Sequence, residues 1–334
     1  EPIKANIFNA AENRMRLFRE NVRNELVAAE AARDSFTLDD LFRLRVLRQK
    51  ADDMGISRDE YALLSDKIDA LESEKAAKIA ADSGKEIFWF KKPGNPAFKS
   101  EVDSDYSDLV GGKGAKTGDL ATFEETRNAL PSGFVISKIV YERFIDETGL
   151  RAAINFIIID DLLTDKEKSE EIKDLISGVE VPASIQEAIK TAYREMYGTN
   201  ADMAVAVRSS ATLEDMPEAS FAGMFSTELY VSGEDAVIES VRNIWISLWN
   251  ERAISYAEES GIEAISMAVV IQKMSNTEKS GIAFTVDVAR NKWNEALINA
   301  GWGLGEGVVS GIENADRYVV DLESGNVLPI LSDK

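Results

Sequence analysis

Residues 205–225, VAVRSSATLEDMPEASFAGMF, begin like a buried strand and then turn abruptly polar. Arg208 follows three apolar residues and precedes two serines, an acidic pair and a proline. An arginine at a strand end that only had to reach solvent would not need this continuation. One that binds an anion places its planar guanidinium beside other donors. The hydroxyl donors that follow are Ser209, Ser210 and Thr212. The alternative is that Arg208 pairs with Glu214 or Asp215 and fixes a loop.

The end of this stretch, residues 220–224, reads SFAGM. Small residues let a backbone approach a ligand closely and move easily. The segment is therefore suited to covering a phosphate chain as a flexible flap. Its candidate binding residues are Ser220, Ala222, Gly223 and Met224.

A second candidate is LVGGKGAKTGDL, residues 109–120. Gly111, Gly112 and Gly114 free the backbone for close approach, and a helix expected over 114–129 begins directly after them. A glycine-rich turn at a helix N-terminus points amide groups and the positive end of the helix dipole at an anion, and Lys113 adds a mobile charge. Neither the Walker A spacing nor the Rossmann fingerprint is present. A purely structural glycine turn is the alternative.

Two later stretches are further candidates. In EALINAGWGLGEGVVSG, residues 295–311, Glu295 and Glu306 frame a glycine-rich turn and are suited to ligand hydroxyls or Mg²⁺. In MAVVIQKM, residues 267–274, a buried strand ends on Gln272, Lys273 and Met274, which are placed to edge a purine pocket. The alternatives are a structural turn for the glycines and plain core for the strand.

The composition limits the ligands and the catalytic groups that this chain can use. The chain has 334 residues, a net charge of -21 and a pI near 4.6, which argues against non-specific binding to nucleic acid or to an anionic membrane. It contains neither cysteine nor histidine, so thiolate nucleophiles and Cys- or His-ligated metals are excluded. Carboxylates, Lys, Arg and hydroxyls suit phosphate and Mg²⁺. No signal peptide or long apolar run is visible, so we expect a cytoplasmic protein.

Apolar periodicity and turn residues predict the organisation of the chain. Residues 1–85 read as a helical extension with capping boxes at Thr37/Asp40 and Ser57/Glu60, either a solvated hairpin or a subunit-docking region. Residues 86–107 read as a linker. Two subdomains of mixed strands and helices are expected over 108–225 and 226–334. The expected strands are 134–136, 204–207, 228–231, 267–271, 281–285, 296–299 and 317–321, and the expected helices include 138–147, 183–197 and 233–259.

Six motifs in order, over about 108–325, resemble one known domain. They are VGGKGAKTGDL, LPSGFVIS, AVRSSATLEDMPEASFAGMF, SLWNERAISY, SGIAFTVD and NAGWGLGEGVVSG. They are closely similar to the N-terminal ATP-binding domain that phosphoenolpyruvate synthase shares with pyruvate phosphate dikinase and rifampin phosphotransferase. The resemblance implies an α+β architecture of ATP-grasp type, in which two subdomains close over ATP, with the helical extension in front of it.

The resemblance also implies roles for individual residues. Lys113 and Arg208 would contact the phosphates, and residues 220–224 would form the loop over them. Glu306 would approach the nucleotide, and residues 272–274 would edge the adenine. The implied cofactors are ATP and Mg²⁺.

Two departures from the family bear on function. The family continues into a segment with an acidic Mg²⁺ ligand and a Gln-x-Arg, which this chain lacks, and its metal ligands are therefore not assigned. The family also relays phosphate through a histidine on a swivelling domain, and this chain has no histidine. We therefore expect either a truncated protein or one subunit of a split enzyme. The second option is similar to phenylphosphate synthase, with a partner subunit that bears the histidine.

The implied reaction cleaves ATP to AMP and phosphate. The phosphoryl group passes to the partner's histidine and then to a small acceptor, for which a phenol or another alcohol is favoured. Three alternatives stay open: a fragment of a pyruvate-directed phosphoenolpyruvate synthase, an inactive nucleotide-binding scaffold, and an ATP-grasp kinase or ligase that releases ADP.

Overall fold

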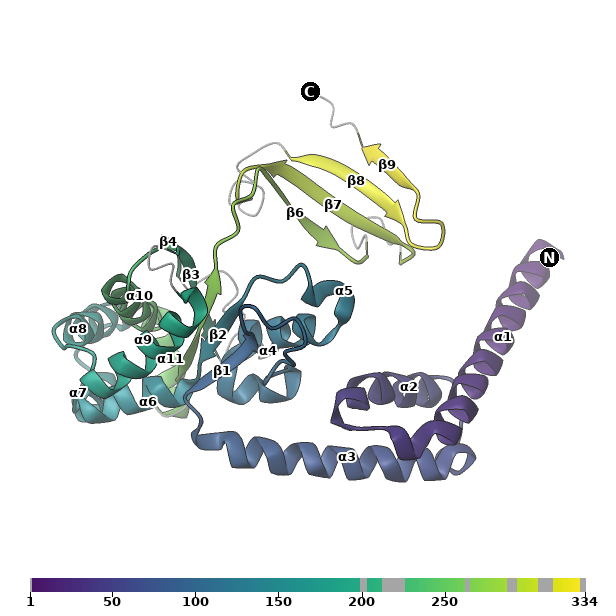
Figure 1. Cartoon of the computed structure of the whole chain (residues 1–334), viewed down its shortest axis with the longest axis horizontal. Helices are drawn as coiled ribbons and strands as arrows, with labels where there is room; N and C mark the ends of the chain where they lie inside the picture. Colours follow the sequence, from purple (N-terminus) through teal and green to yellow (C-terminus); the bar gives the residue numbers. More distant parts are fainter. Residues whose placement is uncertain are drawn as a thin grey trace. The chain divides into compact units, whose positions relative to one another are not determined.

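The computed structural model describes residues 2–198, 203–211, 226–261, 265–286, 293–305 and 315–330. Its contacts divide the chain into two compact units, Glu1–Lys273 and Met274–Lys334. The first unit holds a helical extension and a five-stranded sheet with its helices, and the second holds a four-stranded sheet (Figure 1). Helices combined with antiparallel sheets confirm the expected α+β class, and the helical extension precedes the sheet as predicted.

The extension is built from α-helices joined by short 3₁₀ turns. The α-helices are α1 (Pro2–Ala32), α2 (Leu41–Asp53) and α3 (Ala62–Ala81), and the turns are η1 (Arg33–Ser35), η2 (Leu38–Asp40), η3 (Arg58–Tyr61) and η4 (Asp82–Gly84). Apolar residues at helical spacing bury Val22, Leu44 and Leu64 in a core of the extension's own. Capping boxes at Thr37 and Ser57 begin η2 and η3 as expected.

The larger sheet has the strand order β1-β2-β5-β3-β4, and neighbouring strands are antiparallel. The strands are β1 (Ile87–Lys91), β2 (Gly133–Ile136), β3 (Val205–Ala211), β4 (Thr227–Val231) and β5 (Met267–Lys273). Successive side chains point to opposite faces of a sheet. Val135 and Val270 pack in one core with Val110 of α4 (Ser107–Thr122), whereas Val207 and Ile271 pack in the other core.

The second core is covered by helices from the middle of the chain. The helices of this layer are α6 (Lys138–Glu147), α7 (Leu150–Ile158), α8 (Asp165–Ser177), α9 (Ala183–Tyr197), α10 (Glu234–Ser247) and α11 (Glu251–Ser260). Figure 1 shows them on the side of the sheet away from α4 and α5 (Glu124–Arg127). The turn η5 (Ser104–Tyr106) leads into α4. Of the helices described, none has the length and apolar content needed to cross a membrane.

The second unit is an antiparallel sheet in the order β6-β7-β8-β9. Its strands are β6 (Lys279–Phe284), β7 (Glu295–Trp302), β8 (Asp316–Asp321) and β9 (Val327–Ile330). Gly303 and Gly305 follow β7 with φ of 74° and 84°. Both values lie in the left-handed region that favours glycine, so these two glycines are needed by the turn itself.

Three parts of the expected organisation are corrected. Residues 86–107 are not simply a linker, because β1 pairs with β2 and buries Phe88, Trp89 and Phe90. The predicted boundary at 225/226 falls inside the first unit, because β4 and β5 flank β3 on either side. The expected helix over 233–259 is two helices, α10 and α11. Asn250 lies between them, and its side chain caps the start of α11.

Candidate functional site

The glycine-rich turn lies inside α4. The predicted helix over 114–129 instead begins at Ser107 and is interrupted at Gly111, whose φ of 66° and ψ of 170° are not helical. A Cβ on Gly111 would lie 2.0 Å from the carbonyl oxygen of Ser210 in β3. Only glycine satisfies both the backbone conformation and this close approach. The break starts a second helical segment at Gly112, directly against the sheet.

Ser210 joins this break to β3. Its hydroxyl donates to the carbonyl of Val110 at 2.6 Å and accepts from the amide of Gly114 at 2.9 Å. Ser210 is fully buried. The Ser210 hydroxyl, which we expected among the phosphate donors, is therefore engaged inside the protein, and so is the Gly114 amide. Ser210 instead fixes the position of the turn that carries Lys113.

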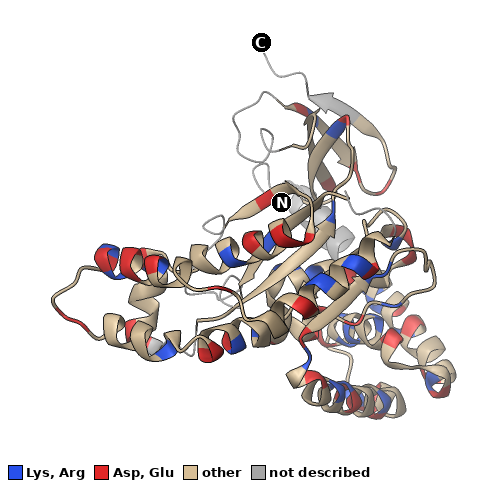
Figure 2. Ribbon diagram, turned by 60° about the vertical axis from the view of Figure 1, so that its left-hand side comes forward, with Lys and Arg blue, Asp and Glu red and all other residues tan. Residues whose placement is uncertain are grey.

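Arg208 lies within β3 rather than after it, because the strand continues to Ala211. In the first unit, charged residues are found mainly on the helices (Figure 2). Within β3, whose sequence is VAVRSSA, Arg208 is the one charged residue. It pairs with Val270, whose side chain lies in the core under α4, so Arg208 shares that face. The alternative partners Glu214 and Asp215 lie outside the described residues.

Gln272 accepts a hydrogen bond from Arg208 on the same face. Arg208 Nη1 lies 3.4 Å from Gln272 Oε1, which fits a diagonal pair on adjacent strands. Both side chains are half-buried. The structure thus brings together the glycine-rich turn, Arg208 and Gln272, which are far apart in sequence. Gly111 contacts Ser210, and Arg208 lies two residues before Ser210 on the same face of β3.

Ser209 is placed on the opposite face of the sheet. Alternation along β3 sends its side chain toward the core that contains Val207, and Ser209 is only 1% exposed. Its Oγ is buried and has no hydrogen-bond partner among the described residues. Ser209 therefore does not join Arg208 on the face under α4.

The remaining candidates fall into three groups. Lys273 ends β5, and its amide donates to the carbonyl of Ser132 at 2.9 Å, while half-buried Met274 begins the second unit. Glu295 begins β7 in the second unit opposite Asp321. The candidates that lie outside the described residues are Thr212, Ser220, Ala222, Gly223, Met224 and Glu306.

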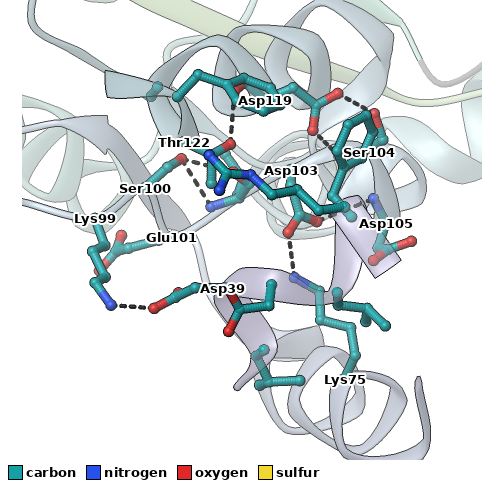
Figure 3. Close-up of a pocket in the computed structure, with 18 of the residues that line it drawn as sticks. Asp39, Lys75, Lys99, Ser100, Glu101, Asp103, Ser104, Asp105, Asp119 and Thr122 are labelled. Atoms are coloured by element: carbon teal, nitrogen blue, oxygen red, sulfur yellow. Dashed lines mark hydrogen bonds and ion pairs between the residues drawn. The ribbon is translucent and has the colours of Figure 1, made fainter. Parts of the chain in front are cut away.

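One further feature escaped the sequence analysis. A cavity of about 290 Å³ lies between the extension and the segment that leads into α4, lined by Lys75, Asp103 and Asp119 among others (Figure 3). Beside it, the hydroxyl of Tyr106 donates to Asp82 at 2.8 Å. Burial, and then this bond to a carboxylate, raise the pKa of Tyr106, so the hydroxyl stays protonated. The only sequence signal was the mixed charge of the extension.

The variant Ser210→Ala tests the link between the turn and the sheet. It leaves the Val110 carbonyl and the Gly114 amide without their buried partner, so we expect a loss of about 2 to 3 kcal/mol in the free energy of unfolding. Urea denaturation measures it. Ser177→Ala, which removes an exposed hydroxyl bond to Lys173, is the control and should cost under about 0.5 kcal/mol. Equal losses in the two variants would show that the bridge is unimportant.

Known proteins resemble the larger part of this chain. The family described as "Pyruvate phosphate dikinase, AMP/ATP-binding domain" matches residues 107–333. A probable phosphoenolpyruvate synthase from Methanothermobacter thermautotrophicus is 39% identical over 241 residues, which are 70% of this chain and 34% of the relative. The phosphoenolpyruvate synthase of Aeropyrum pernix is 38% identical over 240 residues, 69% of this chain and 29% of the relative.

The chain therefore spans about a third of the length of these relatives. The match begins at Ser107, the first residue of α4, so the whole helical extension and η5 lie in front of it. Because the family profile covers more than half of the chain, the assignment does not depend on any single motif. This chain belongs to the pyruvate phosphate dikinase AMP/ATP-binding domain family.

Proposed function

We propose that this chain binds ATP on the face of the sheet under α4 and serves as the nucleotide-binding part of a dikinase. In this proposal ATP is cleaved to AMP and phosphate, and a phosphoryl group passes through a histidine outside this chain to a small acceptor. The observation that carries the proposal is the contact of Gly111 with Ser210, which sets the glycine-rich turn against the strand that bears Arg208.

Each residue of this face has a part in the proposal. Lys113 and Arg208 neutralise phosphate charge, and the planar guanidinium of Arg208 orients two oxygens at once. The helical segment after Gly111 directs the positive end of its dipole to the same place. Gln272 holds Arg208 from the side. Phosphoryl transfer needs little from a protein beyond such positioning and charge stabilisation.

Mg²⁺ is the metal that normally accompanies ATP in such reactions. Within the described ranges no group of three or more acidic side chains gathers to hold a metal ion. Among the described residues, this face therefore offers no acidic cluster that would hold the metal. Glu295 and Glu306 stay predictions for the nucleotide or its metal.

The acceptor histidine must come from outside this chain, because the chain has no histidine. The matched relatives are about three times as long as the matched region, which leaves room in them for such a domain. We propose a histidine-bearing partner that docks on the helical extension, and a phenol or another alcohol as the final acceptor. A pyruvate-directed enzyme is the main alternative for the acceptor.

Isotope labelling tests the reaction. The full chain with ATP alone should hydrolyse it very slowly and acquire no label. After co-expression with a histidine-bearing swivelling domain from a phosphoenolpyruvate synthase, ATP labelled at the β-phosphorus should give a labelled partner and AMP. ATP labelled at the γ-phosphorus should give only labelled inorganic phosphate. Release of ADP would favour a kinase or ligase, and ATP binding without any AMP would favour a scaffold. Either result would contradict the proposal.

A further inference from the structure

A buried lysine of the helical extension contacts the segment that leads into α4. Lys75 of α3 is only 7% exposed, although lysines are rarely buried unless they are paired. Its ammonium forms an ion pair with Asp103, toward which it points in Figure 3. It also lies 5.1 Å from the ring centre of Tyr106, a favourable cation–π distance.

A second contact joins the end of α3 to the same segment. Asp82, the residue after α3, accepts the hydroxyl hydrogen bond of Tyr106 at 2.8 Å. The Tyr106 ring is fully buried in the core under α4, with Phe88 and Val110. Asp103 also caps η5 by accepting from the amide of Asp105 at 3.1 Å. The extension therefore holds η5 at both of its ends.

The turn η5 is in turn fixed to α4. It runs directly into the helix at Ser107, and the amide of Ser104 donates to Asp119 near the other end of α4 at 2.9 Å. A Cβ on Gly118 of α4 would lie 2.2 Å from the carbonyl oxygen of Val102, so the helix and this segment touch at their backbones. A displacement of η5 would therefore move α4 and the glycine-rich turn within it.

We propose that Lys75 and Asp82 of the helical extension are positioning residues for the nucleotide, acting through η5 and α4 on the glycine-rich turn. This inference rests on the proposed nucleotide site. It makes the extension part of the nucleotide-binding apparatus, although the whole extension precedes the region matched by the family. A partner that docks on the extension would then be coupled to the nucleotide through these contacts, because linkage between two sites is reciprocal.

A second buried and ion-paired lysine, Lys168, serves as the control that separates a positioning role of Lys75 from a merely structural one. Lys168 of α8 is 4% exposed, donates to the carbonyl of Ile158 at 2.8 Å and pairs with Glu258. Lys168 and its partners Ile158 and Glu258 belong to the helical layer on the other face of the sheet. Each variant removes a buried ammonium from a partly exposed carboxylate, Asp103 at 30% and Glu258 at 38% side-chain exposure, so both should lower the melting temperature by similar amounts.

The test compares Lys75→Met with Lys168→Met in the full chain. Calorimetry measures the Kd for a non-hydrolysable ATP analogue, and hydrogen exchange measures protection of the amides in residues 110–114. We expect Lys75→Met to weaken binding about tenfold and to speed exchange in the turn, and Lys168→Met to change the Kd by less than about twofold. Lys75→Arg, which keeps the charge, should restore most of the affinity.

Tyr106→Phe keeps the inference testable if Lys75→Met does not fold. It removes only the hydroxyl that reaches Asp82 and should weaken analogue binding about threefold. An unchanged Kd in Lys75→Met or Tyr106→Phe, or equal weakening in Lys168→Met, would overturn the inference. Arg208→Ala separates this failure from failure of the nucleotide site. If Arg208→Ala weakens binding and Lys75→Met does not, only the positioning role is wrong. If neither does, the proposed nucleotide site is wrong.

Discussion

We expect the replacement of Arg208 by alanine to weaken binding of a non-hydrolysable ATP analogue by about 10- to 100-fold, and the replacement of Lys113 by alanine to have a similar effect. In the proposed site each variant would remove a charge-assisted hydrogen bond to phosphate worth about 1.5 to 3 kcal/mol, and each 1.4 kcal/mol corresponds to a factor of ten in Kd. In the reconstituted dikinase the loss in rate should reach about 10² to 10³, because the charge that these groups stabilise grows in the transition state.

Two control variants test whether the effect of Arg208→Ala comes from a lost phosphate contact. Arg208→Lys keeps the charge but loses the planar fork, so it should recover only part of the affinity. Arg194→Ala removes another paired arginine, which binds Glu187 and Glu234 at the surface of α9, and should leave the Kd unchanged. An analogue affinity that is the same in Arg208→Ala and Arg194→Ala would contradict a phosphate role for Arg208.

Gly111→Ala has the largest effect expected on stability. The new Cβ would overlap the Ser210 carbonyl at 2.0 Å, and the backbone has a φ of 66° that alanine adopts at a cost. A backbone with φ of 66° and ψ of 170° is almost confined to glycine and costs another residue about 1 to 3 kcal/mol, and overpacking adds about 1 to 3 kcal/mol. We therefore expect a loss of about 2 to 6 kcal/mol in the free energy of unfolding, measured by urea denaturation.

Gly149→Ala separates the two contributions. Gly149 has a φ of 73°, but a Cβ there would meet nothing within 4 Å. Gly149 has the left-handed α conformation, with ψ of 9°, so its loss should be only the cost of that conformation, about 1 to 2 kcal/mol. Should Gly111→Ala cost no more than Gly149→Ala, the contact between the turn and β3 would be looser than the structure indicates.

Strong periodicity made several elements predictable. The expected helices over 138–147 and 183–197 have the bounds of α6 and α9, because one apolar face of each packs into the main core and turn residues flank them. The order of the motifs also predicted the ATP-binding family, which the comparison confirms. The capping boxes in the extension were predictable from the sequence because each depends on two residues three positions apart.

Long-range contacts were not predictable from local pattern. The aromatic residues of β1 looked like a linker because prolines and charges follow them, yet β2 pairs with this segment and buries it. Ser209 and Ser210 looked equivalent, and only the pleat of β3 sends one to each face. The buried Lys75 resembled its charged neighbours in α3, since its partner Asp103 lies beyond the end of the helix and beyond β1.

A structure of the full chain with a bound non-hydrolysable ATP analogue tests the central claim most directly. The account predicts that the phosphates lie on the α4 face of the five-stranded sheet, within hydrogen-bonding distance of Lys113 and Arg208. Phosphates bound on the opposite face, or in the cavity beside Lys75 and Asp103, would contradict it.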